Sequence, residues 1–122
     1  MREENRDFKA VTRLLELTQE GLLKWESRGP CDDILEGRDI VVDIVYVAAK
    51  DKRLLRLYQF RYKSWLDDVN WHWEEDIALE LSDEKRVTWW RFPENRVLQD
   101  LLEAVKFRTV GVDQFLDELL GQ

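Results

Sequence analysis

The sequence predicts an α+β protein with one N-terminal helix, a four-stranded and mostly antiparallel β-meander, and one long and one short C-terminal helix. Three observations indicate this order. Apolar residues recur at steps of three and four near both ends of the chain, β-branched and aromatic residues concentrate between positions 40 and 92, and polar segments separate these runs. The 122 residues fit a single domain over 1–122, with frayed ends at 1–5 and 121–122.

The N-terminal helix is expected over residues 6–26. Its apolar or near-apolar positions form one stripe: Phe8, Val11, Leu15, Thr18, Leu22 and Trp25. Gly21 weakens the last turn, because glycine has a low helix propensity, so the C-terminal boundary of this helix stays open. Residues 27–39 contain a Gly-Pro pair, a further glycine and several acids, and are predicted to form a loop.

Four strands are expected between residues 40 and 92. The Val- and Ile-rich run 40–49 and the Leu-, Tyr- and Phe-containing run 53–63 flank a short polar turn, which is typical of a hairpin. In the run 71–81 most odd positions are apolar and most even ones polar, so this strand is expected to be half buried. A short fourth strand, 86–92, ends at Pro93, which lacks the N–H group that a ladder needs.

Two helices are expected after Pro93. Apolar residues lie on one face of the segment that ends near Arg108: Val97, Leu98, Leu101, Leu102 and Val105. Gly111 breaks this helix, and Asp113 is suited to cap a final short one. The last helix also has one apolar side, formed by Phe115, Leu116, Leu119 and Leu120.

Composition and charge exclude several classes of protein. The 26 acidic and 19 basic residues give a net charge of -7, which repels phosphate backbones, so no direct nucleic-acid binding is expected. No apolar run approaches the roughly 20 residues that span a bilayer, and residues 1–7 lack the apolar stretch of a secretory signal, so we predict a cytoplasmic protein without a membrane partner. The one cysteine, Cys31, excludes an internal disulfide and thiolate metal centres.

No sequence motif identifies a reaction. Dinucleotide-binding, P-loop, zinc-protease, nucleophile-elbow and calcium-loop patterns are absent from the sequence. A nucleophilic enzyme would need a serine or Cys31 beside His72, the one histidine, and no local signature supports such a pairing. We therefore expect neither catalytic residues nor a cofactor.

One alternative is a metal-assisted enzyme. His72, Glu74 and Asp76 share one face of the expected strand 71–81, and one imidazole with two carboxylates is a ligand set for a divalent ion. The competing interpretation, which we favour, is a solvated acidic strand face of the kind that is common on half-exposed strands.

Charge is divided between two neighbouring segments. Residues 50–63 carry six bases and one acid, whereas residues 64–84 carry eight acids and neither Lys nor Arg. If the second and third strands pair, bases such as Arg56, Arg61 and Lys63 face acids such as Glu74 and Asp76, and most of the field cancels. The alternative is an acidic ridge that attracts a basic protein or mimics the charge of a nucleic acid.

Aromatic residues give the most informative pattern, because nine of them lie between Tyr58 and Phe92. Consecutive strand residues point to opposite faces, so Trp89 and Trp90 do not enter the same layer of a regular strand. The expected strands other than 71–81 are likewise apolar on both faces. One helical layer covers one face of a sheet, so the second face needs the remaining helices, another subunit or a ligand.

We predict a non-catalytic protein–protein interaction or adaptor module that forms a homodimer or binds a protein partner through an aromatic sheet face. The residues of that face are Trp65, Trp71, Trp73, Trp89, Trp90, Tyr58 and Tyr62. Size and acidity are similar in general character to those of small bacterial adaptors of the secretion-chaperone kind and of immunity or inhibitor proteins. A further alternative is a carrier of a small apolar ligand in a pocket lined by Trp71, Trp73 and Trp89.

Overall fold

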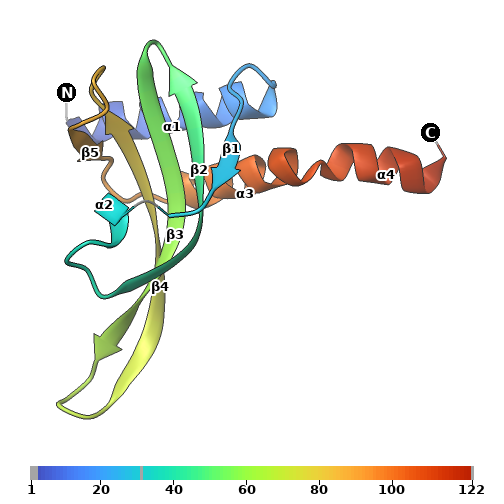
Figure 1. Cartoon of the computed structure of the whole chain (residues 1–122). Coiled ribbons are helices and arrows are strands. Elements are labelled where there is room, and N and C mark those ends of the chain that lie inside the picture. Colours follow the sequence, from blue (N-terminus) through green and yellow to red (C-terminus); the bar gives the residue numbers. More distant parts are fainter. Residues whose placement is uncertain (1–2, 31, 122) are drawn as a thin grey trace.

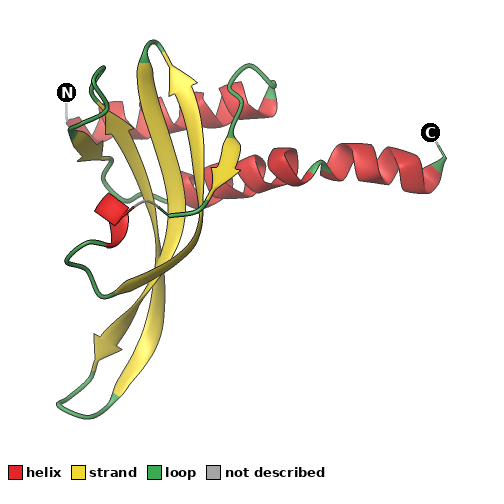
Figure 2. Cartoon of the chain, viewed as in Figure 1, coloured by secondary structure: helices red, strands yellow, loops and turns green. Residues whose placement is uncertain are grey.

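The structure is a computed structural model that describes residues 3–30 and 32–121 (Figure 1). Five strands form one antiparallel sheet in the order β1-β2-β3-β4-β5, accompanied by an N-terminal helix and two C-terminal helices (Figure 2). The elements are α1 (Glu3–Gln19), β1 (Glu26–Arg28), α2 (Asp32–Leu35), β2 (Ile40–Lys50), β3 (Arg53–Trp65), β4 (Trp71–Ser82), β5 (Trp89–Arg91), α3 (Val97–Val110) and α4 (Val112–Leu120). The α+β class and the antiparallel meander are confirmed, whereas the predicted number of four strands is wrong.

The additional strand is β1, in a segment for which the sequence predicts the end of a helix and a loop. Glu26 pairs with Val47 and Arg28 with Val45, so β1 forms one edge of the sheet. All three of its residues are exposed, and none of them is apolar, so hydrophobic periodicity gives no sign of this strand. Backbone pairing with the edge of β2 is what makes the segment extended.

The first helix ends at Gln19 rather than near residue 26, because Gly21 adopts a left-handed conformation with φ +77°. The chain turns there, so Trp25 comes back into the core instead of continuing a helical stripe. Its indole N–H donates a hydrogen bond to the Thr18 hydroxyl (3.0 Å), which in turn donates to the Leu14 carbonyl (2.8 Å). The segment after α1 is thus fastened to the helix that precedes it.

The helices α1 and α3 pack on one face of the sheet (Figure 2). The core between them contains Val11 of α1, Leu57 and Leu79 of the sheet, and Leu101 of α3, all with 0% exposure. The apolar stripe predicted for the long C-terminal helix is confirmed, because all five of its residues are buried. Each fully buried side chain of this size contributes about 1.5–3 kcal/mol.

Part of the opposite face of the sheet is covered by α2 and the residues after it, in a segment that the sequence predicts to be only a loop. There α2 places Ile34 against a second apolar cluster. That cluster consists of Ile34, Val42, Val45, Val47, Tyr58 and Ala78. The protein's own α2 therefore covers this part of the second face, and no other subunit or ligand is needed there. Cys31, just before α2, lies outside the described residues.

A β-bulge in β2 explains why this strand is apolar at consecutive positions. Val42 pairs with Phe60 and Val45 with Tyr58, so two residues of β2 stand opposite one residue of β3. The bulge reverses the alternation, and Val42 and Val45, three positions apart, both face α2. Tyr46 then joins the core beneath α1 and α3. Odd and even positions of β2 therefore exchange faces at the bulge.

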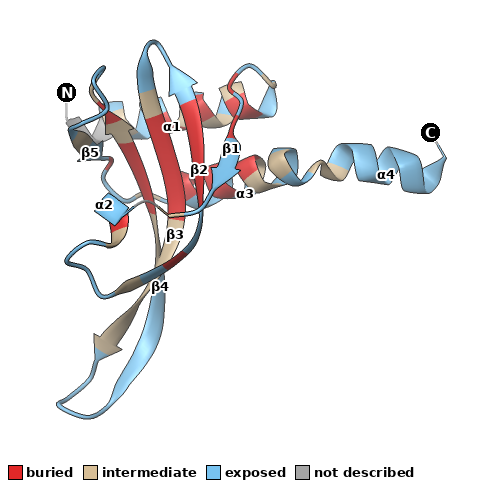
Figure 3. Cartoon of the chain, in the orientation of Figure 1, coloured by how far each residue is buried: buried red, intermediate tan, exposed pale blue. Residues whose placement is uncertain are grey.

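Two parts of the chain extend beyond these layers (Figure 3). The β3–β4 hairpin continues past the helices to a tip, residues 65–75, in which every residue is exposed, and α4 leaves the sheet beyond α3 without a buried residue. In the described ranges, no helix combines the length and the apolar character that crossing a membrane requires. The first helix begins at Glu3, inside the segment 1–5 that was predicted to fray, while residues 1, 2 and 122 lie outside the described chain.

Candidate interaction surface

Three tryptophans line one face of the hairpin tip. Trp65 and Trp71 are cross-strand partners, and Trp73 is the next residue of β4 on the same face. The ring centroids lie 6.3 Å apart for Trp65 and Trp71, and 5.2 Å apart for Trp71 and Trp73, which meet edge to face at 83°. Between 38% and 56% of each residue stays exposed. We call these three residues the aromatic ridge.

Two bases lie over the aromatic ridge. Lys63 Nζ is 4.6 Å from the centre of the Trp71 ring, and the guanidinium carbon of Arg61 is 5.8 Å from that of Trp73. Cation–π contacts at exposed sites stabilise by about 0.5–1 kcal/mol. Glu75, opposite Arg61 in the ladder, is the acid on the same side. We call the aromatic ridge together with Arg61 and Lys63 the hairpin face, a basic aromatic surface on an acidic chain.

The turn at the tip holds the two strands in register. Asp67 Oδ1 accepts hydrogen bonds from the backbone N–H groups of Val69 (2.9 Å) and Asn70 (2.8 Å), and Oδ2 accepts one from the Asn70 side-chain amide (2.8 Å). These bonds, that of the Asn70 side chain above all, hold the pKa of Asp67 below its ordinary value. An aspartate that bonds the backbone two residues on is a common turn former, so the sequence itself shapes this tip.

A recess of about 170 Å³ opens where the hairpin face meets α3. Its walls include Ile44 of the bulge, Arg61 and Glu75 of the hairpin, and Leu102 and Lys106 of α3. An apolar cavity of about 150 Å³ is large enough for benzene, whereas small-molecule sites occupy about 300–1,000 Å³. The recess is therefore of the size of one large side chain rather than of a cofactor.

The structure separates the residues of the predicted aromatic face. Tyr58 is fully buried, so its assignment to an exposed surface is wrong. Tyr62 lies on the other side of the hairpin from the aromatic ridge. Trp89 is covered by the Arg56 guanidinium, whose carbon is 3.7 Å from the ring centre. Trp90 is 49% exposed and belongs to β5, at the other end of β4. Only the aromatic ridge remains together.

The predicted ligand pocket of Trp71, Trp73 and Trp89 does not form. Trp89 pairs with Ser82 at the end of β4, whereas Trp71 begins the same strand. At about 3.3 Å per residue, this difference along β4 places Trp71 and Trp89 about 35 Å apart. The assumption that the aromatic residues of neighbouring strands gather at one place fails because β3 and β4 are much longer than β5.

The other side of the hairpin carries the predicted metal ligands. His72 and Glu74 are loosely paired, with 3.9 Å between Nε2 and Oε2, and the charge of Glu74 raises the pKa of Tyr62. Asp76 interacts with Glu94 rather than with His72 or Glu74. The hydrogen bond between Asp76 and Glu94 and the charge of Asp76 both raise the pKa of Glu94. Among residues 3–30 and 32–121, no three or more His, Cys, Asp and Glu side chains are grouped so as to hold a metal ion.

Charge pairing along the hairpin also differs from the prediction. Arg61 stands opposite Glu75 in the ladder. Glu74 and Asp76, the acids expected to face the bases, stand opposite Tyr62 and Phe60 instead. A shift of one residue in register sends the bases to the side of the aromatic ridge and Glu74 to the opposite side. Arg61 and Arg56 therefore do face acids across the ladder, Glu75 and Glu80, whereas Glu74 and Asp76 lie on the opposite side of the hairpin from Arg61 and Lys63.

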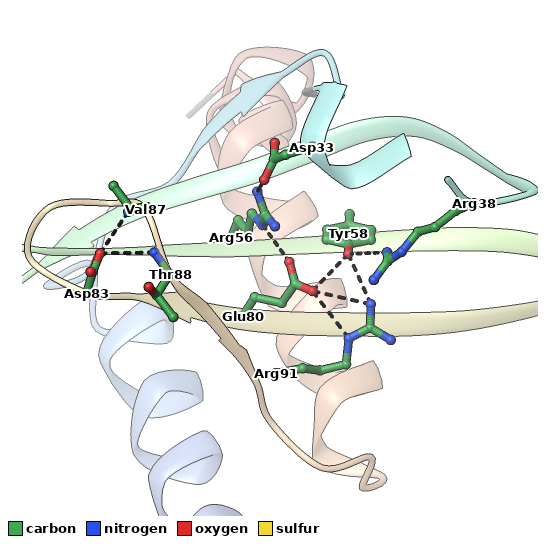
Figure 4. A network of polar contacts seen from close by, with 9 residues as sticks. All are labelled: Asp33, Arg38, Arg56, Tyr58, Glu80, Asp83, Val87, Thr88 and Arg91. Carbon is green, nitrogen blue, oxygen red and sulfur yellow. Dashed lines mark hydrogen bonds and ion pairs between the residues drawn. The ribbon is translucent and has the colours of Figure 1, made fainter. Parts of the chain in front are cut away.

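A buried polar network lies on the α2 side of the sheet, and the sequence gives no direct sign of it (Figure 4). Glu80 accepts hydrogen bonds from Arg56, from Arg91 (3.3 Å) and from the Tyr58 hydroxyl (3.1 Å). That hydroxyl accepts from Arg38 (3.4 Å) and from Arg91 (3.3 Å). Arg56 stands opposite Glu80, and the sequence does not reveal the register that creates this pair. Arg56 thus faces an acid across the ladder, as the sequence suggests for the bases of this strand, but the acid is Glu80.

The network fastens α2 to the sheet. Arg56 also donates to Asp33 of α2 at 2.8 Å. Burial lowers the pKa of the Arg56 guanidinium, but its hydrogen bonds with Asp33 and Glu80 outweigh burial and raise that pKa above its ordinary value. Within the described chain, every buried side-chain nitrogen and oxygen has a hydrogen-bond partner. A buried network satisfied in this way stabilises the position of α2 on the sheet.

The helix α4 is a second exposed apolar surface. Phe115, Leu116, Leu119 and Leu120 remain between 41% and 66% exposed. Gly111, with φ +77°, ends α3 and begins α4, and it occupies the cap position that the sequence predicts for Asp113. The sequence reveals the apolar side of this helix, but not that all four of its residues stay more than two-fifths exposed.

Comparison of the chain with models of protein families, with curated proteins and with solved structures finds no match.

Proposed function

We propose that the protein is a non-catalytic interaction module that binds another polypeptide through the hairpin face. The observation that supports this function is the aromatic ridge, three neighbouring tryptophans that stay 38% to 56% exposed on a hairpin reaching beyond the helices. Tryptophan offers a large apolar area with one polar edge, and it is enriched among the residues that dominate binding energy at protein interfaces.

The surroundings of the aromatic ridge extend the apolar surface. Leu66 and Val69, in the turn next to it, are more than two-thirds exposed, at 71% and 78%. Scattered apolar residues are ordinary on a protein surface, but a contiguous group of large ones marks a binding site. The rigid turn around Asp67 keeps this group in one arrangement, which lowers the entropy cost of binding.

The charges of the hairpin favour a polypeptide over a nucleic acid. Aromatic rings next to Arg61 and Lys63 resemble the stacking platforms that bind single-stranded nucleic acids. However, Asp67 and Asp68 occupy the tip, and the chain carries a net charge of -7, so a phosphate backbone is repelled. A segment that combines apolar side chains with a few carboxylates suits the hairpin face.

A selection of displayed random peptides on the immobilised protein tests this function. We expect the selected peptides to be apolar and acidic, and to bind at least tenfold more weakly to a Trp71→Ala, Trp73→Ala double variant. The matched control is Trp90→Ala, which removes another half-exposed tryptophan from the opposite end of β4 and leaves binding unchanged.

Two results would overturn the proposed function. One is that the selected peptides bind the double variant as strongly as the original protein, because the aromatic ridge then has no part in recognition. The other is that single-stranded oligothymidine binds the hairpin face while no peptide does, which would make the surface a nucleic-acid platform.

A further inference from the structure

We infer that the hairpin face is occupied by α4 of a second copy of this chain, with the exchange reciprocal, so that two copies form a two-fold symmetric dimer. This inference rests on the proposed function, because it names the polypeptide that the hairpin face binds. Each copy presents one donor helix and one acceptor surface, which is the arrangement that a closed isologous dimer requires.

The apolar side of α4 is largely uncovered, because its four large residues are between 41% and 66% exposed. None of its nine residues is buried, and it leaves the sheet beyond α3 (Figure 1). A nine-residue helix is too short to be stable in water by itself, since isolated helices below about 12–15 residues are marginal. An amphipathic helix of this kind gains its stability by packing its apolar side on another surface.

The charges of α4 and of the hairpin face are complementary. The acids of α4 are Asp113, Asp117 and Glu118, and this helix contains no base. The hairpin face carries Arg61 and Lys63, and Lys106 lies at the recess beside it. Glu75 and Asp43 are the acids that line the same recess. Arg61 already has Asp43 at 3.9 Å and Glu75 opposite it in the ladder, whereas no acid of the described chain lies as close to Lys63 or Lys106. The three bases exceed the two acids on this surface, which favours an acidic helix over a basic segment.

The helix α4 and the aromatic ridge also match in length. At about 1.5 Å per residue α4 is about 13 Å long, and at about 3.3 Å per residue the stretch of β4 from Trp71 to Glu75 has the same length. At the end of that stretch lies the recess of about 170 Å³, which is large enough for the ring of Phe115. The two surfaces therefore match in length and offer a socket for the largest side chain of the helix.

The exposed apolar area of the aromatic ridge and α4 is close to that of a standard interface. The seven large apolar residues of the aromatic ridge and α4 are between 38% and 66% exposed. If a fully exposed side chain of this kind presents about 200 Å², these residues offer about 700 Å² per copy, close to the ~800 Å² per partner of a standard interface. A reciprocal dimer that covers both surfaces thus reaches the size that stable complexes have.

Charge reversal tests the inference, because a reciprocal interface can be broken and restored. The hairpin variant is Arg61→Glu, Lys63→Glu, and the helix variant is Asp113→Lys, Asp117→Lys. In a homodimer of either variant, like charges meet, and we expect sedimentation equilibrium to show the dissociation constant raised at least tenfold. In a mixture of the two variants, both contacts join opposite charges again, so we expect a one-to-one heterodimer that neither variant forms with itself.

A control variant, Lys9→Glu, Lys85→Glu, changes the net charge by the same amount as the hairpin variant, at exposed residues of α1 and of the β4–β5 turn, and is expected to dimerise normally. Circular dichroism of each variant confirms that it is folded. Three results would overturn the inference: an original chain that stays monomeric, a dimer that hairpin reversal leaves intact, or variants that do not combine. If the chain is monomeric but the selected peptides still require the aromatic ridge, the dimer fails while the proposed function stands.

Discussion

Arg56 and Glu80 stand opposite each other on β3 and β4, and both are almost fully buried, with exposures of 6% and 5%. Each of the two charges is satisfied by the other and by further hydrogen bonds, since Glu80 also accepts from Tyr58 and Arg91, and Arg56 also donates to Asp33. A buried ion pair adds little net stability over apolar residues of the same size, but it is costly to break from one side. The pair therefore fixes where α2 lies on the sheet.

Removal of the Glu80 carboxylate is expected to lower the stability of the fold strongly. Glu80→Ala leaves the buried guanidinium of Arg56 without its main partner and should lower the free energy of unfolding by about 3–5 kcal/mol. Urea denaturation measures the loss. The control is Glu94→Ala, which removes an exposed carboxylate and should change stability by less than about 0.5 kcal/mol. A loss for Glu80→Ala as small as that of the control would show that water replaces the network.

Trp25→Phe removes the indole N–H that bonds Thr18 while keeping an aromatic ring in the core. The lost hydrogen bond and the smaller ring should together cost about 1–2 kcal/mol. Trp90→Phe is the matched control, because Trp90 is half exposed, and the same change there should cost less than about 0.5 kcal/mol. Equal thermal midpoints for the two variants would contradict the role given to Trp25 in fastening the segment after α1.

The Asp76–Glu94 pair should make stability depend on pH. The hydrogen bond and the charge of Asp76 raise the pKa of Glu94 above its ordinary value of 4.5, so the folded chain holds this proton more tightly than the unfolded chain does. Stability therefore falls as the pH rises from the ordinary value through the raised pKa. Glu94→Gln removes the repulsion and should raise the thermal midpoint at pH 7 by about 1–2 °C, with no gain below pH 4.

If the thermal midpoint of Glu94→Gln rises equally at pH 7 and below pH 4, this account is wrong, because a gain that does not depend on pH does not come from the titration of Glu94. Asp76→Asn relieves the same repulsion from the other side. We expect it to reproduce the gain at pH 7, and the two changes together should gain little more than either alone, since they remove one shared interaction.

Gly21 is expected to resist substitution. Its φ of +77° is unfavourable for any residue with a Cβ, and an added Cβ would lie 2.3 Å from Nη2 of Arg108, whose flexible side chain can move away. Gly21→Ala should therefore cost about 1–2 kcal/mol, mainly from the backbone. Gly29→Ala, at a glycine with open space around it and without positive φ, is the control and should not destabilise. Equal chemical denaturation midpoints would overturn this explanation for the end of α1.

The sequence predicts those elements whose apolar residues repeat with a clear period. β3 and β4 begin where expected, at Arg53 and Trp71, and the buried stripe of α3 is the predicted one. β1 escapes prediction because its three exposed residues bury nothing, and α2 because it is one turn long, with Ile34 its one buried residue and Leu35 partly buried beside it. Both elements are held by partners that come from elsewhere in the chain.

The candidate site is likewise predictable only in part. The aromatic ridge follows from the sequence, since Trp71 and Trp73 lie on one face of any strand, and Trp65 is close by across the turn. What the sequence cannot provide is register, which places Tyr58 under α2 and Trp89 under Arg56 rather than beside the aromatic ridge. The bulge before Val45 adds to this, because one extra residue in a strand exchanges the faces of all that follow it.

The open edge of β4 has a consequence for solubility. β5 pairs only with Glu80–Ser82, so along residues 71–78 the described chain places no strand on that edge, and such an edge readily adds strands from other molecules. Glu74, Glu75 and Asp76 stand there, and their mutual repulsion between molecules protects the edge at neutral pH. Near the isoelectric point of about 4.8 this protection weakens, so acidification should drive the protein toward intermolecular β-aggregates that begin at this strand.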